Sequence, residues 1–315
     1  MLLGIIVLAT PHLVSGQLIE SMATGATGKT YRKRAITKIP FQQMTPAVSQ
    51  KVSDVVNGAS LYRQLPVTTI ESDPDLYLFL LRYPETIIST WGLMDVSEMT
   101  ATRTGPYSLT ATDGAGTTTS ADLIYGDPTL NIYYAEGEYD GPMILRKVKG
   151  KCVIVVESEF RRGQDGKVRV TSRMNFFLKI DNLAASIIAK TIHPLVGTTA
   201  DHNFVETLKF AEKLSETAEK NGPGVQRMAN RLKGLDPNVQ RRFQELVGLT
   251  FQRAQTRSEG AAAGAGTAIQ GRFASDQAGL TNPGTLQPAG VRNIQNSPTT
   301  YSMGDSQKSA RYPGR

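Results

Sequence analysis

The chain has 315 residues, of which 40% are hydrophobic and 20% are charged, a balance that is ordinary for a globular protein and excludes disorder over the whole length. Lysine and arginine number 35 against 28 aspartate and glutamate residues, and the resulting net charge of +7 is spread along the chain with acids interleaved through most of the middle. That distribution argues against nucleic-acid binding, which usually concentrates basic residues on one face.

The single cysteine, Cys152, excludes an intramolecular disulfide and a cysteine-rich metal site. It lies in the apolar run Lys151–Val156, where a thiol usually packs as a small hydrophobic group. A nucleophilic role would need an activating base and partial exposure to solvent. We therefore expect Cys152 to be buried and unreactive.

The first residues form a short apolar leader. Met1–Thr10 is mostly aliphatic, and Val14-Ser15-Gly16 offers small residues at which a signal peptidase could cut before Gln17. The apolar run is shorter than the ~20 residues that span a bilayer. The sequence thus predicts a signal peptide over 1–16 and a secreted or periplasmic protein, and leaves open whether the leader is cleaved or retained as an anchor.

Composition divides the rest of the chain into an irregular segment over 17–45, an α+β domain over 46–220, a basic helical extension over 221–256 and a disordered tail over 257–315. Gly25, Gly28 and Pro40 interrupt any period in the first of these segments. The tail consists mainly of Gly, Ala, Ser, Thr, Gln and Pro, so it buries too little apolar surface to offset the entropy of ordering.

Two helices are predicted before the strands. Thr45-Pro46 opens the first, with threonine as the cap and proline in the first turn, and apolar residues recur at helical spacing as far as Tyr62. A second, shorter helix is predicted over Asp73–Leu81, again with an Asp-Pro start and with a stop near Pro84.

From Glu85 to Ile180 the sequence changes to β-type segments separated by Gly, Asp and Pro turns. Alternation is most regular in Lys167–Phe176, which indicates a strand with one buried and one solvated face. Asp165-Gly166 is typical of a hairpin turn, so we predict antiparallel pairing there. The predicted strands are Thr86–Leu93, Glu98–Thr104, Tyr107–Thr112, Ala121–Tyr125, Asn131–Glu136, Met143–Val148, Lys151–Phe160 and Val168–Ile180.

Helical periodicity returns after the strands. An apolar stripe that includes Phe204 and Leu208 predicts an amphipathic helix over Asp201–Lys220, capped by Asp201 or Thr199 and ended by Asn221–Gly224. Further helices are predicted over Leu183–Ile192, Val225–Leu232 and Pro237–Gln255.

This order of elements predicts an α+β fold, in which a curved antiparallel sheet packs against a long C-terminal amphipathic helix, with extra C-terminal helices. Through Tyr83-Pro84-Glu85, Phe176–Asp181 and Asp201–Glu206 the chain resembles the START-like, or helix-grip, superfamily. The resemblance covers about residues 46–220 and is topological, without a diagnostic motif. It implies a sheet that grips the long helix over a ligand cavity. A lipocalin-like barrel and a plain sheet-and-helix sandwich are the alternatives.

Several patterns fall short of the chemistry that they suggest. Ala23–Thr30 matches a relaxed phosphate-binding loop, but Arg32–Arg34 and Pro40 follow it where a long helix is required. His193 and His202 are too few for a zinc site, because the only other histidine lies in the leader.

Two pairs of acids, Asp201 with Glu206 and Glu136 with Glu138, have spacings that carry little information about glycoside chemistry, which requires two carboxyl groups to face one bond. A charged solvent face is the commoner explanation. We therefore predict no catalytic residues, no metal site and no cofactor.

Aromatic residues recur on the predicted strands, where they either fill an ordinary core or line a ligand cavity. The candidate cavity-lining residues are Trp91, Tyr125, Tyr133, Phe160, Phe176, Phe204 and Leu208.

Three functions are compatible with these features. The first is an exported, non-enzymatic binding or structural domain that holds a hydrophobic, lipid-like small molecule between sheet and helix. The second is a cell-envelope interaction protein whose basic helices over 225–257 hold a protein or a polyanionic component. The third is a hydrolase, which would require Asp201, His202 and a strand carboxylate to converge in one cleft.

Overall fold

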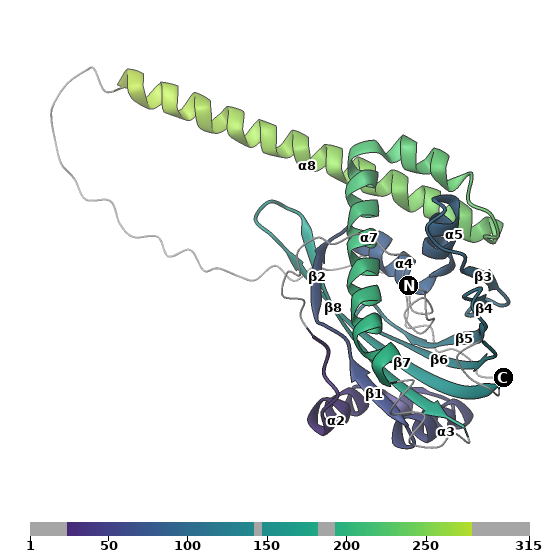
Figure 1. Cartoon of the computed structure of the whole chain (residues 1–315). Helices are drawn as coiled ribbons and strands as arrows, with labels where there is room; N and C mark the ends of the chain where they lie inside the picture. Colours follow the sequence, from purple (N-terminus) through teal and green to yellow (C-terminus); the bar gives the residue numbers. More distant parts are fainter. Residues whose placement is uncertain (1–23, 142–146, 182–192, 279–315) are drawn as a thin grey trace.

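An eight-stranded antiparallel sheet forms the centre of the structure, a computed structural model that describes residues 24–141, 147–181 and 193–278 (Figure 1). The strands are β1 (Leu61–Gln64), β2 (Thr68–Glu71), β3 (Thr100–Arg103), β4 (Ser108–Thr112), β5 (Thr117–Gly126), β6 (Leu130–Tyr139), β7 (Val148–Arg162) and β8 (Val168–Ile180). Their order is β1-β8-β7-β6-β5-β4-β3, and β2 also pairs with β8. The last strand therefore returns to pair with the first two.

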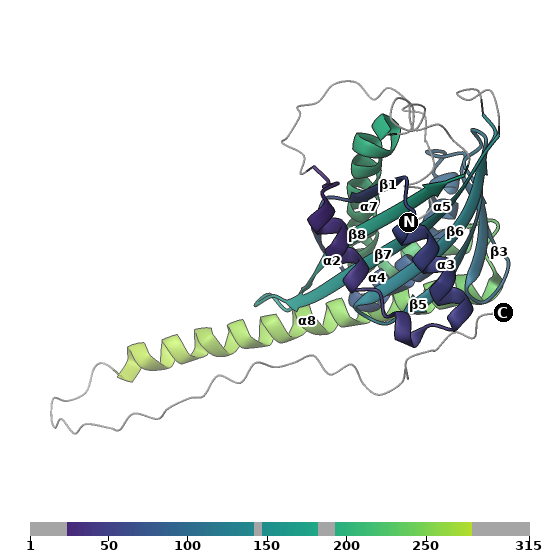
Figure 2. The same ribbon diagram turned by 90° about the horizontal axis from the view of Figure 1, so that it is seen from below.

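Helices cover both faces of this curved sheet (Figure 2). The convex face carries α2 (Lys29–Thr37) and α3 (Pro46–Asn57), whereas α4 (Pro74–Arg82), α5 (Glu85–Leu93), α7 (His193–Ala229) and α8 (Pro237–Ala278) lie on the concave side. Alternation in β7 serves both cores, because Cys152 and Ile154 face the concave side while Val153 and Val155 face α3. The α+β class, with its antiparallel sheet and long C-terminal helices, is confirmed.

Helix α3 begins as predicted but ends earlier. Thr45 Oγ1 accepts a hydrogen bond from the backbone N–H of Val48 at 3.4 Å, and Pro46 occupies the first turn. The helix ends at Asn57, before Gly58, and does not reach Tyr62. Tyr62 instead lies in β1, where its ring packs on Phe177 at 4.9 Å, so pairing with β8 decides its conformation.

Residues 24–45 contain a helix where the sequence predicted none. The glycines that suggested irregular structure precede the helix, since Gly28 is the residue before α2, and Pro40 follows its end. Between them Ala35 and Ile39 are buried against the convex face. The predicted interruptions are therefore the boundaries of α2.

Helix α4 is confirmed, with the Asp73 carboxylate accepting hydrogen bonds from the N–H groups of Asp75 and Leu76 at 3.0 and 3.1 Å. The strand predicted over Thr86–Leu93 is wrong, because this segment is α5. Its β-branched residues resemble a strand, but the Thr90 hydroxyl donates to the carbonyl of Thr86 at 2.8 Å, which accommodates threonine within a helix.

The remaining strands occur where the sequence predicted them, and β8 has the predicted bounds. The Asp165-Gly166 turn joins β7 to β8, with Gly166 at φ +74°. Residues 143–146 of the strand predicted over Met143–Val148 lie outside the described residues, and β7 begins at Val148.

Two long helices close the chain. Helix α7 begins at His193, earlier than the predicted start at Asp201, while the helix predicted over Leu183–Ile192 lies outside the described residues. The predicted stop at Asn221 is a kink, where the backbone leaves helical geometry with φ −144° and ψ 60°. Helix α8 starts at Pro237 as predicted but continues to Ala278, past the expected start of a disordered tail.

Candidate functional site

Polar contacts fix α7 along the edge strands of the sheet, above its concave face (Figure 1). Near the start of the helix, the Asp201 carboxylate accepts a hydrogen bond from Arg63 Nε at 2.7 Å. Further along, Ser215 Oγ accepts a bond from the backbone N–H of Asp73 at 2.9 Å. The apolar side of the helix, including Phe204 and Leu208, is thereby held toward the sheet.

The concave wall changes in depth from one end of the sheet to the other. At the level of Arg63, neighbouring strands present the large side chains Leu123, Tyr133, Ile154 and Phe176. In the next row Cys152, Ala135 and Ala121 of the central strands lie between Leu178 on one side and Leu109 on the other. The row after it contains Ile180, Gly150, Gly137, Thr119, Ala111 and Ala101. Along the central strands β5 to β7, the wall is thus lined by small side chains at the end where α7 begins.

Six of the seven candidate lining residues meet on this concave side. Tyr133, Phe160 and Phe176 belong to the sheet, Phe204 and Leu208 to α7, and Trp91 to α5, and all pack in or against one hydrophobic cluster. Trp91 makes an edge contact with Phe210 of α7 at 5.8 Å between ring centroids. The ring of Phe160 packs in the same way on Tyr77 at 5.9 Å.

Tyr125 lies on the opposite face of the sheet. A register shift between Leu123 and Tyr125 breaks the alternation of β5, so Tyr125 pairs with Ile132 and packs on the convex cluster. Its hydroxyl group bonds to Asp127 Oδ2 at 2.9 Å. Burial raises the pKa of Tyr125 to about 12.

Tyrosine hydroxyl groups within the concave core have protein partners. The hydroxyl of Tyr77 lies 2.9 Å from Ser158 Oγ and 3.1 Å from Ser172 Oγ, and burial raises its pKa. Tyr133 donates to the carbonyl of Leu81 at 2.9 Å. These groups hold α4 on the sheet, so their hydrogen-bonding capacity serves the fold.

A buried ion pair beside α5 was missed from the sequence. Arg103 of β3 bonds to both carboxylate oxygens of Glu85 at 2.6 and 2.9 Å, and its guanidinium group lies 4.6 Å from the ring centroid of Tyr83. Glu85 is 1% exposed. No local signal marks this pair, because its members lie on a helix and a strand that meet only in the folded chain.

Three buried polar atoms on the helices of the concave side have no hydrogen-bond partner among the described residues: Thr86 Oγ1 on α5, Asn203 Nδ2 on α7 and Thr250 Oγ1 on α8. The rest of this side is dominated by aliphatic and aromatic groups. A mostly apolar surface with a few polar groups is suited to binding an apolar molecule in a fixed orientation.

The acids and histidine considered for catalysis do not form a joint site. Asp201 is paired with Arg63 and also accepts the N–H of Gly25 at 2.8 Å, while His202 is exposed on α7. Glu136 accepts the Tyr134 hydroxyl at 2.5 Å. Across the described parts of the chain, no three His, Cys, Asp or Glu residues are grouped as metal ligands.

Cys152 is buried, and burial raises the pKa of its thiol to about 12. Because the thiolate is the reactive form, we expect a thiol reagent at pH 8 to modify the native protein at least about a thousandfold more slowly than the urea-unfolded chain. Absorbance of the released chromophore measures both rates. Comparable rates in the two states would contradict a buried thiol.

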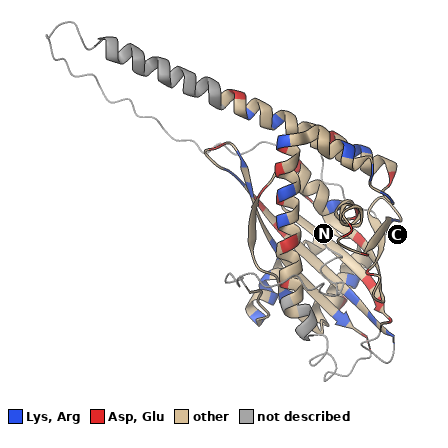
Figure 3. Ribbon diagram, turned by 45° about the horizontal axis from the view of Figure 1, so that its top comes forward, with Lys and Arg blue, Asp and Glu red and all other residues tan. Residues whose placement is uncertain are grey.

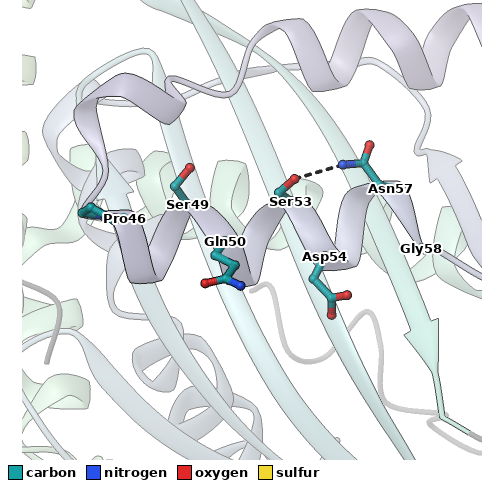
Figure 4. A pocket seen from close by; sticks show the side chains of 7 residues that line it. All are labelled: Pro46, Ser49, Gln50, Ser53, Asp54, Asn57 and Gly58. Carbon is teal, nitrogen blue, oxygen red and sulfur yellow. Dashed lines mark hydrogen bonds between the residues drawn. The ribbon is translucent and has the colours of Figure 1, made fainter.

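An open depression of about 670 Å³ lies along α3 on the convex side (Figure 4). Its lining is polar, and Asn57 Nδ2 donates to Ser53 Oγ at 3.0 Å within it. Lys179 bonds to Asp54 at 2.6 Å, which lowers the pKa of that carboxyl group. The depression is widely open to solvent, so it would leave most of a ligand exposed and is a weaker candidate than the concave face.

Comparison with known proteins assigns the chain to no family. Neither a scan against protein-family models nor a search of curated proteins finds a match. Among the described helices, none is both long and apolar enough to cross a membrane.

Proposed function

We propose that this chain is an exported, non-enzymatic binding domain of the START-like, or helix-grip, kind, which holds a hydrophobic small molecule between the concave face and α7. The order of elements supports the proposal. Two short strands, β1 and β2, precede the helices α4 and α5, and six strands then follow as a meander. The long helix α7 comes after the last strand, β8, which pairs back to both β1 and β2. A curved sheet that grips a long C-terminal helix is the pattern of that superfamily.

The observation that carries the proposal is the gradient of side-chain size along the concave wall. Large residues such as Tyr133 and Phe176 close one level, while on the central strands Ala121, Ala135 and Gly137 line the levels beyond it, between Leu109 and Leu178. Short side chains on a sheet require filling from the opposite side, because protein interiors are close-packed. A bound apolar molecule would supply that filling.

Hydrolysis is less well supported, because Asp201 is engaged by Arg63 and the Gly25 N–H, and His202 points to solvent. Interaction through the basic helices over 225–257 is weakened in a similar way. Arg253 bonds to Asp73 and Asp75, and Arg257 bonds to Glu219, so these two cations serve the fold.

Replacing a small residue of the concave wall with a large one tests the proposal. We expect the purified chain to bind a fluorescent fatty-acid analogue, and Ala135→Phe to reduce its affinity at least about tenfold, because the new ring would occupy the ligand's space. Thermal unfolding of Ala135→Phe should change little, since space reserved for a ligand accepts a ring without strain.

The matched control is Ala35→Phe in the convex core, because Ala35 and Ala135 are equally buried, at 2% and 3% exposed, and differ in the face of the sheet on which they lie. Overpacking there should cost about 1–3 kcal/mol while probe affinity stays unchanged. If the unaltered chain binds no probe and Ala135→Phe is destabilised like Ala35→Phe, the space is an ordinary core and the ligand proposal fails.

A further inference from the structure

Helix α2 carries an unbalanced group of positive charges. Between Glu20 and Asp54 the sequence contains no acidic residue and six basic ones: Lys29, Arg32, Lys33, Arg34, Lys38 and Lys51. Ala35 is the buried residue of α2, whereas most of the cations of this helix are exposed to solvent. Figure 3 marks the positions of Lys and Arg on the ribbon in blue. We call Lys29, Lys33 and Arg34 the α2 basic surface.

The other cations of this segment have partners. Arg32 donates to the carbonyls of Val56 and Asn57 at the end of α3, at 2.7 and 2.9 Å, and Lys38 lies 4.0 Å from Glu157. In contrast, no carboxylate within the described residues pairs with the α2 basic surface. Its three charges, all exposed, are therefore available to an external anion.

We propose that the α2 basic surface docks the protein onto a membrane rich in anionic phospholipids. Lys and Arg near such a surface are attracted by its negative potential. Only a short segment separates Lys29 from the apolar leader over 1–16, which, where it is retained, would add a hydrophobic anchor beside the basic surface. Tyr31, 46% exposed on the same helix, adds a side chain suited to the headgroup region.

A nucleic acid fits this surface less well. Proteins that bind single strands usually offer several aromatic rings for base stacking, whereas α2 exposes Tyr31 alone. A helix that reads a duplex would place polar side chains such as Asn, Gln and Arg against base edges. The α2 basic surface consists of long cations without Asn or Gln beside them, which suits a diffuse layer of headgroup phosphates.

Sedimentation of the full chain with vesicles tests the proposal. We expect tighter binding to vesicles of two parts phosphatidylcholine to one part phosphatidylglycerol than to phosphatidylcholine alone, and weaker binding as NaCl is raised. The triple variant K29Q/K33Q/R34Q should bind the anionic vesicles on the order of 100-fold more weakly. Its thermal unfolding should match that of the unaltered chain, because the three side chains are exposed.

The matched control is R227Q/R231Q/R241Q, which removes the same net charge from exposed positions of α7, of the turn after it and of α8. It should bind anionic vesicles nearly as well as the unaltered chain. Equal loss in both triple variants, or equal binding of the unaltered chain to neutral and anionic vesicles, would overturn the proposal. The proposal would also be overturned if duplex DNA bound the unaltered chain as tightly as the anionic vesicles do and no longer bound K29Q/K33Q/R34Q. Should that variant fail to fold, the single variants K33Q and R34Q take its place, and each should weaken binding to the anionic vesicles about fivefold.

Discussion

Replacing Asp201 with alanine is expected to lower the free energy of unfolding by about 3–5 kcal/mol. The carboxylate is buried and serves both the Arg63 guanidinium and the N–H of Gly25. Its removal would leave the Arg63 side chain, 12% exposed, as a buried charge without its partner. Urea unfolding followed by circular dichroism measures the change.

The control for this substitution is Glu206→Ala on the same helix. Glu206 pairs with Lys209 at 3.0 Å, but both side chains are about half exposed, so the loss should stay below about 1 kcal/mol. A double variant, Arg63→Met with Asp201→Leu, should recover part of the stability lost in Asp201→Ala, because no charge then remains buried. Equal, small effects of Asp201→Ala and Glu206→Ala would contradict the assigned role.

Phe243→Ala in α8 is expected to destabilise the protein by about 3–5 kcal/mol, because it empties a fully buried site. The ring of Phe243 stacks on Phe79 of α4, with centroids 5.8 Å apart and planes 5° apart. Loss of this ring would loosen both helices together. Calorimetry should therefore show a single unfolding transition at a lower temperature than in the unaltered chain.

The matched position on the same helix is Leu249, which is 38% exposed, so Leu249→Ala should cost less than about 1 kcal/mol. The comparison also tests the predicted boundary at residue 220. If the helices beyond it were a separate extension, Phe243→Ala would leave the main transition in place and shift only a minor one.

Local chemistry made part of the fold predictable. Thr45 and Asp73 are N-caps in the structure as the sequence indicated, since their side chains bond to the first free N–H groups of α3 and α4. The Asp165-Gly166 turn is similar, because Gly166 adopts a positive φ that few residues tolerate. Each of these signals depends on residues within one turn of the chain.

Elements whose conformation depends on residues far away in the sequence were not predictable in this way. β1 is four residues long, and its register comes from residues such as Leu178, which follow it by over a hundred positions. The β-branched run in α5 favours a strand by local preference, yet Ile87 packs into the concave core as part of a helix. Tertiary packing overrides intrinsic preference at such positions.

The lining of the candidate site was predictable wherever side chains alternate strictly between the two faces of the sheet. Tyr133 and Phe176 face the concave side as strict alternation requires, whereas Tyr125 does not, because the register shift in β5 reverses its direction. The Glu85–Arg103 pair and the unpartnered Thr86 hydroxyl carry no local pattern at all. They depend on how α5 meets β3.

Pairing of β1 and β2 with β8 also governs the order in which the protein can be completed. Strands β3 to β8 can form as successive hairpins while the chain leaves the ribosome, but Leu61 and Ile70 must wait for Leu178 and Val170. Contacts this distant in sequence slow folding, because a large loop must close before they form. Pairing of β1 and β2 with β8 is therefore expected to be a late step of folding. Until it occurs, the apolar residues of β1 and β2 need protection from aggregation.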